Sequence, residues 1–332
     1  MLLDNARSLK AKLLEKFVPE ISLPEMVRTM AIRTQSMSSE FQAMRSFALG
    51  ISQASEGYRI AVRVQRRVLL DHPMIERIRK VSKGEIDVKY VGRLEKMKKK
   101  KAKKTGGHQQ LVIGCSIGHE QVTAGTLGCF VSSRIDSATL ILSNNHVLAN
   151  ENQAGAGDDI LQPGSLDGGT SPDDVAAHLV RFVRLKKSRM NLVDCAVAQP
   201  LEEIKFNPRK LGSFGNLKGL GPDFLDEGTL VRKVGRTTGE TTGRVTAFEM
   251  DNVVVSYDLG NLRFDNQIEI EGQGTGSFSD GGDSGSLIFT EDNLGIGLLF
   301  AGGDSGGKNG QGLTYANPLK TVLDQLKVDL VF

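Results

Sequence analysis

Short apolar segments separated by glycine-rich turns run through residues 111–332, and no other feature limits the fold of this chain as strongly. Segments such as TLILS and SLIF have the length and the side chains of buried strands. Glycine suits the tight turns between such strands because it accepts backbone conformations that other residues avoid. The segment NPLKTVLDQLKV is predicted to form a closing helix. This pattern predicts a mainly β domain built as two β-barrels.

One of these turns places a serine directly before an apolar strand, in the sequence GGDSGSLIF of residues 281–289. The glycines around Ser284 let the backbone turn tightly and leave amide N–H groups free to face a developing oxyanion. A serine hydroxyl is a weak nucleophile unless a base and a carboxylate that orients the base stand beside it. Ser284 is therefore a candidate nucleophile if the chain supplies both groups.

A histidine that follows one predicted strand and an aspartate in another strand-like run meet this need. His146 follows an apolar strand in the segment TLILSNNHVLA. Asp194 lies in the apolar run NLVDCAVA, where an isolated charge would be costly without a hydrogen-bonding partner, and a histidine is such a partner. We expect His146 and Asp194 to come from the first barrel and Ser284 from the second, and the three to meet in the cleft between the barrels.

Four segments, in this order along the chain, resemble the serine proteases of the chymotrypsin fold. SNNHV is similar to the histidine segment of the HtrA branch, VDCAVA to its aspartate strand and GDSGS to its serine loop. KVGRTTGETTGRV, residues 233–245, resembles the strand and turn upstream of the serine in streptogrisin and alpha-lytic type proteases. The pattern also resembles the plant Narrow Leaf trypsin-like family. Over residues 111–332 the resemblance implies a chymotrypsin-like double β-barrel that hydrolyses peptide bonds.

The resemblance also implies a role for each residue that matches the catalytic motifs. His146 would take the proton of Ser284 as the hydroxyl attacks a peptide carbonyl, and would then pass it to the leaving amine. Asp194 would fix the tautomer of the imidazole and stabilise the imidazolium. The backbone N–H groups of Gly282 and Ser284 would hold the oxyanion.

Asp283 is expected to shape this oxyanion hole through a buried ion pair. By resemblance to the streptogrisin branch, a cation on the strand before GRTTG supplies the positive charge, and Lys233 stands at the matching place. Arg236 is the competing cation. With either of them, the enzyme needs no cleavage to become active. The alternative reading of Lys233 is an exposed lysine in a strand.

A second serine, Ser305, lies in the literal pentamer GDSGG within AGGDSGGKNG. The sequence after each serine separates the two candidates. SLIF, a buried-strand pattern, follows Ser284, whereas the polar loop GKNGQG follows Ser305. Ser284 is therefore predicted as the nucleophile, and Ser305 as a surface turn at the rim of the substrate pocket.

Phe278, Phe300 and Gly302 are predicted to line the substrate pocket. Phe300 stands where the family often carries a serine beside the triad aspartate, so Asp194 is expected to lack one hydrogen bond. Phe278 lies six residues before Ser284, where trypsin-like enzymes carry an acidic residue. No acidic residue stands there, so we expect an apolar or small side chain before the scissile bond.

The charge of the chain is divided sharply between its two ends. Residues 1–110 contain 24 Lys and Arg against 11 Asp and Glu, whereas residues 111–332 contain 18 against 28. Residues 95–108 include seven lysines, and such blocks repel themselves and are typical of linkers. We therefore predict an N-terminal domain (1–94), a Lys-rich linker (95–110) and a protease domain (111–332). The positive charge of the N-terminal domain would dock it on the acidic protease domain, or would steer acidic substrates.

The N-terminal domain is predicted to be a small α/β accessory domain. Apolar residues at helical spacing, from Leu2 to Phe17, mark an amphipathic helix, and residues 39–49 suggest another. YRIAVRVQ, RVLLDHPMIERIRKV and EIDVKYVG then predict a strand, a helix and a strand. An inhibitory pro-region, a substrate-docking module and an oligomerisation module explain this domain equally well.

Composition and spacing exclude several other classes of partner. No 18-residue apolar run is present, so no membrane span is expected. No aromatic residue interleaves with the linker lysines, so nucleic acid is not an expected partner. Metal-ligand spacing and a phosphate loop are absent, so no cofactor is expected. Cys115, Cys129 and Cys195 are too few for a disulfide framework, which favours a cytoplasmic location.

The leading prediction is a cytosolic serine endopeptidase that cleaves protein or peptide substrates through Ser284, His146 and Asp194. The alternative is a protease-like protein that binds a peptide or partner without catalysis. An esterase would use the same triad and differ only in its pocket. The sequence leaves homo-oligomerisation open.

Overall fold

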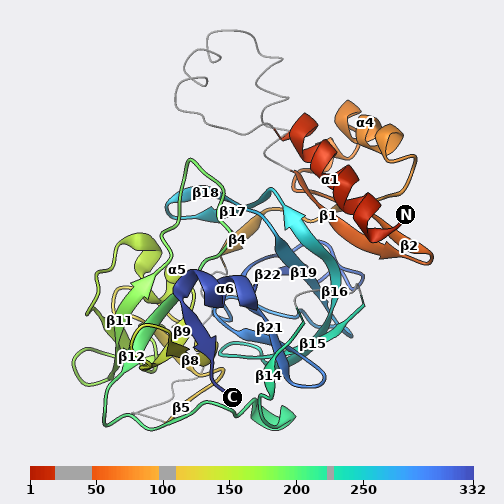
Figure 1. Ribbon diagram of the computed structural model, residues 1–332. Coiled ribbons are helices and arrows are strands. Elements are labelled where there is room, and N and C mark those ends of the chain that lie inside the picture. Colours follow the sequence, from red (N-terminus) through yellow and green to blue (C-terminus); the bar gives the residue numbers. More distant parts are fainter. Residues whose placement is uncertain (19–46, 97–109, 223–227) are drawn as a thin grey trace, which may run out of the picture.

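The first of two β-barrels in residues 111–332 is an open, curled sheet (Figure 1). The computed structural model describes residues 1–18, 47–96, 110–222 and 228–332. The strand order of the sheet is β23-β8-β9-β12-β11-β10-β6-β7. Its strands are β6 (Ser116–His119), β7 (Gly125–Thr126), β8 (Cys129–Ser133), β9 (Thr139–Ser143), β10 (Asp159–Leu161), β11 (Val175–Phe182), β12 (Ala196–Pro200) and β23 (Val328–Leu330).

The second barrel closes on itself through antiparallel pairs. The pairing runs from β15 through β16, β19, β22, β21 and β20 back to β15. These strands are β15 (Leu230–Gly235), β16 (Gly239–Asp251), β19 (Gln267–Gly272), β20 (Leu287–Thr290), β21 (Leu294–Gly303) and β22 (Leu313–Pro318). The prediction of a mainly β, chymotrypsin-like double β-barrel is confirmed.

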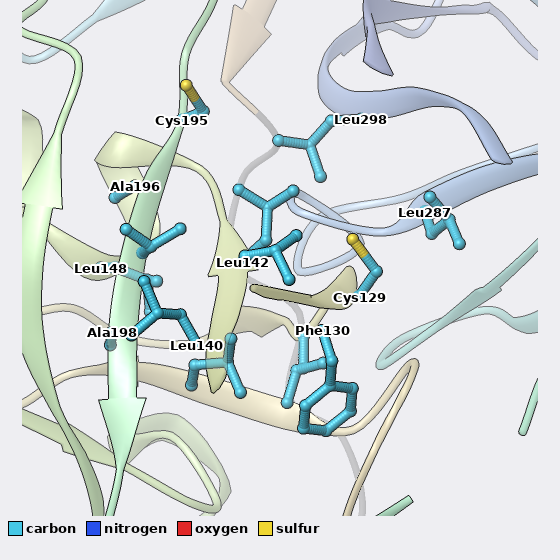
Figure 2. Close-up of a cluster of buried hydrophobic side chains, with 14 of the residues drawn as sticks. Cys129, Phe130, Leu140, Leu142, Leu148, Cys195, Ala196, Ala198, Leu287 and Leu298 are labelled. Carbon is cyan, nitrogen blue, oxygen red and sulfur yellow. The ribbon is translucent and has the colours of Figure 1, made fainter. Parts of the chain in front are cut away.

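A continuous apolar core joins the two barrels (Figure 2). Leu142 on β9 and Ala196 on β12 belong to the same buried cluster as Leu287 on β20 and Leu298 on β21. Apolar residues of the predicted closing helix, α6 (Leu319–Leu326), extend this cluster. Burying apolar surface from both barrels in one core fixes their relative position. The strand ends that carry the predicted catalytic residues are thereby held in place.

The N-terminal part contains the predicted helix and β-α-β unit. Helix α1 (Leu3–Phe17) and strand β1 (Phe47–Ala54) precede β2 (Gly57–Val64), the short helix η1 (Arg67–Leu69), α4 (Pro73–Val81) and β3 (Ile86–Tyr90). β2 and β3 pair in parallel, as a β-α-β connection requires. Pro73 is tolerated because it begins α4, where His72 Nδ1 accepts the Met74 N–H. Residues 47–49 lie in β1, so the helix predicted for them is wrong; residues 39–46 lie outside the described residues.

The N-terminal part shares a sheet with the second barrel. β1 pairs with β16, and β4 (Leu94–Lys96) lies between β17 (Val253–Tyr257) and β21. Glu95 and Lys96, the first residues of the predicted linker, therefore belong to a strand, and residues 97–109 lie outside the described residues. Figure 1 shows β4 beside the hairpin that β17 forms with β18 (Gly260–Phe264).

Short elements complete the described chain. No helix in the described ranges is long and apolar enough to cross a membrane. The remaining elements are β5 (Leu111–Val112), α5 (Asn145–Leu148), η2 (Asn150–Asn152), η3 (Ser165–Asp167), β13 (Phe206–Asn207), η4 (Gly212–Phe214) and β14 (Gly219–Leu220).

Candidate active site

The three predicted catalytic residues lie at strand ends of the two barrels. His146 is in α5, a single helical turn that directly follows β9. Asp194 lies just before β12, which pairs with β9, so the strand register places it beside the histidine helix. Ser284 lies in the glycine-rich turn that precedes β20. As predicted, the first barrel supplies His146 and Asp194, and the second supplies Ser284.

The serine turn and the histidine helix meet at the two residues of β7, Gly125 and Thr126. The carbonyl of Ser284 accepts a hydrogen bond of 2.8 Å from the Thr126 N–H in β7. A Cβ atom added at the neighbouring Gly125 would lie 2.5 Å from Val147 Cγ2 and 3.0 Å from the Ser284 carbonyl oxygen. Only glycine fits between the two, and its small size lets Ser284 approach the turn that carries His146.

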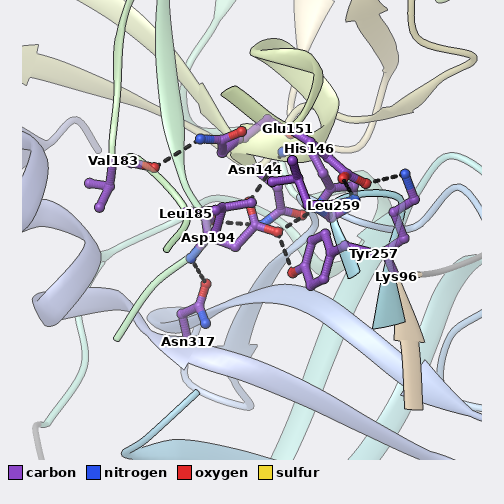
Figure 3. A network of polar contacts seen from close by, with 12 residues as sticks. Lys96, Asn144, His146, Glu151, Val183, Leu185, Asp194, Tyr257, Leu259 and Asn317 are labelled. Carbon is purple, nitrogen blue, oxygen red and sulfur yellow. Dashed lines mark hydrogen bonds and ion pairs between the residues drawn. The ribbon is translucent and has the colours of Figure 1, made fainter. Parts of the chain in front are cut away.

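Asp194 is the centre of a hydrogen-bond network (Figure 3). His146 Nδ1 lies 2.5 Å from Asp194 Oδ2, and the His146 backbone N–H donates to Asp194 Oδ1 at 3.2 Å. The hydroxyl of Tyr257 donates to Asp194 Oδ2 at 2.6 Å. The main chain of Asp194 is held by Asn144, which donates to its carbonyl, and by Asn317, which accepts its N–H. The carboxylate is therefore fixed in position and faces the imidazole.

This network keeps Asp194 ionised although it is fully buried. Burial by itself raises the pKa of a carboxyl group, but the electrostatic interaction with His146 and the hydrogen bonds from His146 and Tyr257 outweigh it, so the pKa of Asp194 lies below its usual value. Burial, followed by the charge of Asp194, raises the pKa of Tyr257 well above its usual value. Tyr257 therefore remains a protonated donor, and Asp194 remains an acceptor.

Asp194, which the sequence predicts to lack one hydrogen bond, receives one from Tyr257. Phe300 is fully buried, and its ring lies 4.7 Å from that of Phe264. Phe264 in turn stacks on Tyr257, with ring centroids 5.9 Å apart. Phe300 therefore packs against the aromatic pair that positions the tyrosine. The alternation of buried residues in VVVSY places Tyr257 on the inner face of β17, but nothing in the sequence connects it with Asp194.

Replacing Tyr257 with Phe is expected to slow the reaction of Ser284 about tenfold. A hydrogen bond to a charged group contributes roughly 1.5–3 kcal/mol, and Asp194 keeps its two bonds from His146 in the variant. The measurement is the rate of labelling by a fluorophosphonate, with Tyr90→Phe as the matched control. An unchanged rate in Tyr257→Phe would show that the tyrosine packs beside Asp194 without assisting it.

The atoms predicted to act as base and nucleophile are buried. His146 Nε2 and Ser284 Oγ are both without a hydrogen bond in the part of the chain that the structure describes. Buried polar atoms without partners are rare in proteins, because each costs free energy. Here the two are the base and the nucleophile predicted from sequence. Hydrogen bonds of this kind are often long before a substrate binds.

The predicted oxyanion hole lies in the same turn. The carbonyl of Gly281 accepts from Thr237 Oγ1 at 2.7 Å, and in a trans peptide the following N–H points the opposite way. Gly282 has φ +101°, and a Cβ there would lie 2.1 Å from Arg236 Nη1, so the position requires glycine. Neither Gly282 nor Ser284 donates its backbone N–H to another group within the described ranges. Both N–H groups remain open to an oxyanion.

Asp283 forms a buried ion pair with one of the two expected cations. Lys233 Nζ lies 3.3 Å from Asp283 Oδ2, and both side chains are fully buried. Burial lowers the pKa of Lys233, and the charge of Asp283 offsets part of that effect. Arg236 instead binds both carboxylate oxygens of Asp167, each at 2.5 Å. The structure thus places Lys233, and not Arg236, at Asp283.

The carboxylate of Asp283 anchors the turn as well as pairing with the lysine. Its Oδ1 accepts the N–H groups of Thr237 and Thr238, at 2.9 and 3.2 Å. Its Oδ2 accepts the Asp280 N–H at 2.9 Å. These bonds tie the start of the serine turn to the segment after β15. The orientation of the Gly282 N–H therefore depends on a charged Asp283.

The three predicted pocket residues lie in different surroundings. Phe278 is in the core of the second barrel, and its ring centroid lies 5.8 Å from Lys233 Nζ. Phe300 is in the apolar cluster between β21 and the β17–β18 hairpin. Gly302 is at the end of β21, opposite Glu95 of β4. Ser305 follows β21 and lies against Gly92, where an added Cβ would come within 3.0 Å of its Oγ.

The cysteines are not positioned for catalysis. All three are free thiols, and Cys195 and Cys129 are fully buried. Burial raises the pKa of Cys115 to about 11, and burial followed by the charge of Asp194 raises that of Cys195 well above its usual value. Among the described residues, no three His, Cys, Asp or Glu side chains are grouped to hold a metal ion.

No family model and no curated protein matches this chain. Solved structures of chymotrypsin-like serine proteases are similar to it. Thermobifida fusca protease A has 17% identity and a TM-score of 0.47, over 67% of this chain and 99% of that one. Nocardiopsis protease has 15% identity and a TM-score of 0.47, over 68% and 100% of the two chains. The HtrA-type protease AlgW has 22% identity and a TM-score of 0.35, over 62% and 52%.

Proposed function

We propose that this chain is a serine endopeptidase that hydrolyses peptide bonds through Ser284, His146 and Asp194. One observation carries the proposal. The buried, unpartnered Nε2 of His146 and Oγ of Ser284 accompany a histidine whose other ring nitrogen is bonded to an ionised, fully buried aspartate. A purely structural histidine would have both ring nitrogens satisfied or exposed to water.

The reaction follows from the direction of these hydrogen bonds. Asp194 accepts the Nδ1 proton of His146, so Nε2 carries the lone pair that takes the Ser284 proton as Oγ attacks the carbonyl carbon. The N–H groups of Gly282 and Ser284 stabilise the oxyanion. His146 then gives its proton to the leaving amine, and the acyl group remains on Ser284 until water, deprotonated by the same nitrogen, releases it.

Two further candidates use the same geometry. A binding protein with a protease fold would retain the cleft without turnover, and an esterase would use the triad with a different pocket. The complete network around Asp194 favours catalysis over binding alone, because a binding cleft does not need an ionised, buried carboxylate behind the histidine.

The proposal includes docking of the basic N-terminal part on the acidic protease domain. Ion pairs of Arg7 with Glu249, at 2.6 Å, and of Lys10 with Asp251, at 2.8 Å, support it. A homo-oligomer remains a second arrangement for this part. The cytoplasmic location is also proposed, and it rests on the sparse cysteines in apolar settings.

Labelling by a fluorophosphonate tests the activity without knowledge of the substrate. The reagent should modify Ser284 in the full chain, as mapped by peptide mass spectrometry, and Ser284→Ala should remove the label. Ser305→Ala is the control and should label like the wild type. A label on Ser305, or none on a folded full chain, would contradict the proposal.

A further inference from the structure

β4 is a three-residue strand that fills a slot between two other strands. Its Lys96 and Glu95 pair antiparallel with Ala301 and Gly302 at the end of β21. On its other side, Leu94 pairs in parallel with Val255 of β17. An extended segment that adds to a sheet edge is a general mode of peptide recognition, in which the main chain gives affinity and side-chain pockets give selectivity.

The slot leads to the catalytic turn. The carbonyl of Leu299 in β21 accepts the Gly285 N–H at 2.8 Å, and its N–H donates to the Ser286 carbonyl at 3.0 Å, so Leu299 is bonded to the two residues that follow Ser284. β4 runs antiparallel to β21, so the chain direction from Glu95 to Lys96 leads toward Leu299. Each residue along this direction lies ~3.3 Å nearer to Leu299. A peptide in the place of β4 therefore runs C-terminally toward the Ser284 turn, which is the direction that would present its next carbonyl groups to the nucleophile.

Two side chains of β4 enter complementary surroundings. Leu94 is 1% exposed and belongs to an apolar cluster with Val255 and Leu313. Lys96 Nζ pairs with Glu151 (Figure 3). It also pairs with Asp258, at 2.7 Å. Burial would lower the pKa of Lys96, but its bonds to Asp258 and Glu151 outweigh it and raise that pKa. The slot thus has an apolar position and, two residues later, an acidic one.

Backbone groups hold the carboxylate of Glu151, which forms the acidic position. Glu151 is 2% exposed and has φ +53°, between Asn150 and Asn152, which also have positive φ. Its carboxylate accepts the N–H groups of Asp258 and Leu259, at 3.1 and 2.8 Å. Consecutive non-glycine residues with positive φ are strained, and they persist only where surrounding interactions hold the backbone in that conformation. These bonds keep the Glu151 carboxylate at the slot, beside the turn that carries His146.

We propose that the slot between β17 and β21 is a peptide-binding site that residues 94–96 fill in the resting chain. In exchange for them it accepts an extended substrate segment with a large apolar residue and, two positions later, a lysine or arginine. This inference rests on the proposed endopeptidase function and names its substrate class. The full chain should then react slowly with peptides but normally with small reagents that do not need the slot.

Two kinds of reagent separate the slot from the triad. A fluorophosphonate without a peptide reports the reactivity of Ser284 alone. A diphenyl phosphonate that carries the peptide acyl-Leu-Glu-Lys-Phe must also bind in the slot. Lys96→Glu, which places a carboxylate against Glu151 and Asp258, should raise the ratio of peptide to small-reagent labelling rates at least about tenfold. Lys96→Gln should raise it less and keeps the test valid if the charge reversal impairs folding. Lys80→Glu, on the exposed face of α4, is the control for the change in charge.

A second comparison tests the preference for a basic residue. In Lys96→Glu, acyl-Leu-Glu-Lys-Phe phosphonate should label at least about tenfold faster than acyl-Leu-Glu-Glu-Phe phosphonate, because Glu151 and Asp258 remain in the slot. Equal ratios in wild type and both Lys96 variants would show that β4 is a permanent strand and would overturn the inference. Loss of fluorophosphonate labelling in every chain would instead contradict the endopeptidase function.

Discussion

Asp194→Asn is expected to slow fluorophosphonate labelling of Ser284 by ~10⁴-fold, the loss typical when a triad aspartate becomes asparagine. The hydrogen bonds around this residue give the reason. The His146 backbone N–H donates to Oδ1, so the single oxygen of the asparagine must stay on that side. Its NH₂ group then faces His146 Nδ1 in place of Oδ2. A donor at this position forces the imidazole proton onto Nε2, and the base can no longer accept the Ser284 proton.

The same variant should keep its fold, because asparagine has the shape of aspartate and the Tyr257 hydroxyl can accept from the new NH₂ group. The thermal unfolding midpoint checks this. Asp292→Asn, at an exposed position, provides the matched control and should label at the wild-type rate. A loss below about tenfold in Asp194→Asn would mean that His146 is oriented by other contacts, and the triad assignment would have to be withdrawn.

The candidate catalytic residues can be identified from the sequence because each depends on local chemistry. Ser284 requires glycine on both sides, and GGDSGSLIF shows this directly. Asp194 is a charge within an apolar run of sequence, where it requires a hydrogen-bonding partner. The barrels follow from short strands and turns, since the pattern of buried residues repeats along each strand. Each of these features depends on a few residues that are neighbours in the sequence, so it can be detected without knowledge of the tertiary arrangement.

The supporting residues depend on contacts between distant segments, so the sequence does not reveal them. Tyr257 lies 63 residues from Asp194 and reaches it because the β17–β18 hairpin lies beside the segment that carries Asp194, where Phe264 bridges to Asn191. The choice between Lys233 and Arg236 is made by Asp167, which binds the arginine. The pairing of β4 with β21 has no local signal either, because three residues before a lysine-rich block are compatible with a linker.

Lys233→Met is expected to lower the free energy of unfolding by about 3–5 kcal/mol, which is typical when one partner of a buried ion pair is removed. Lys233 and Asp283 are both fully buried, so the substitution leaves an uncompensated carboxylate in the core of the second barrel. Chemical denaturation measures the loss. Lys218→Met removes an exposed lysine and should change the stability little, whereas a Lys233→Met protein as stable as wild type would contradict a charged, buried pair.

The double variant Lys233→Met/Asp283→Asn separates charge from geometry. Removing both charges should restore most of the lost stability, since no buried charge remains. It should not restore labelling, because the introduced asparagine would have one oxygen where Asp283 uses two, one for the Thr237 and Thr238 N–H groups and the other for the Asp280 N–H. An NH₂ group facing the Asp280 N–H would release the turn that orients the Gly282 N–H. Because loss of one oxyanion donor costs ~10²–10³-fold in rate, the double variant should be stable and at least about 10²-fold slower than wild type. A double variant that is both stable and fast would show that Asp283 is needed only to neutralise Lys233.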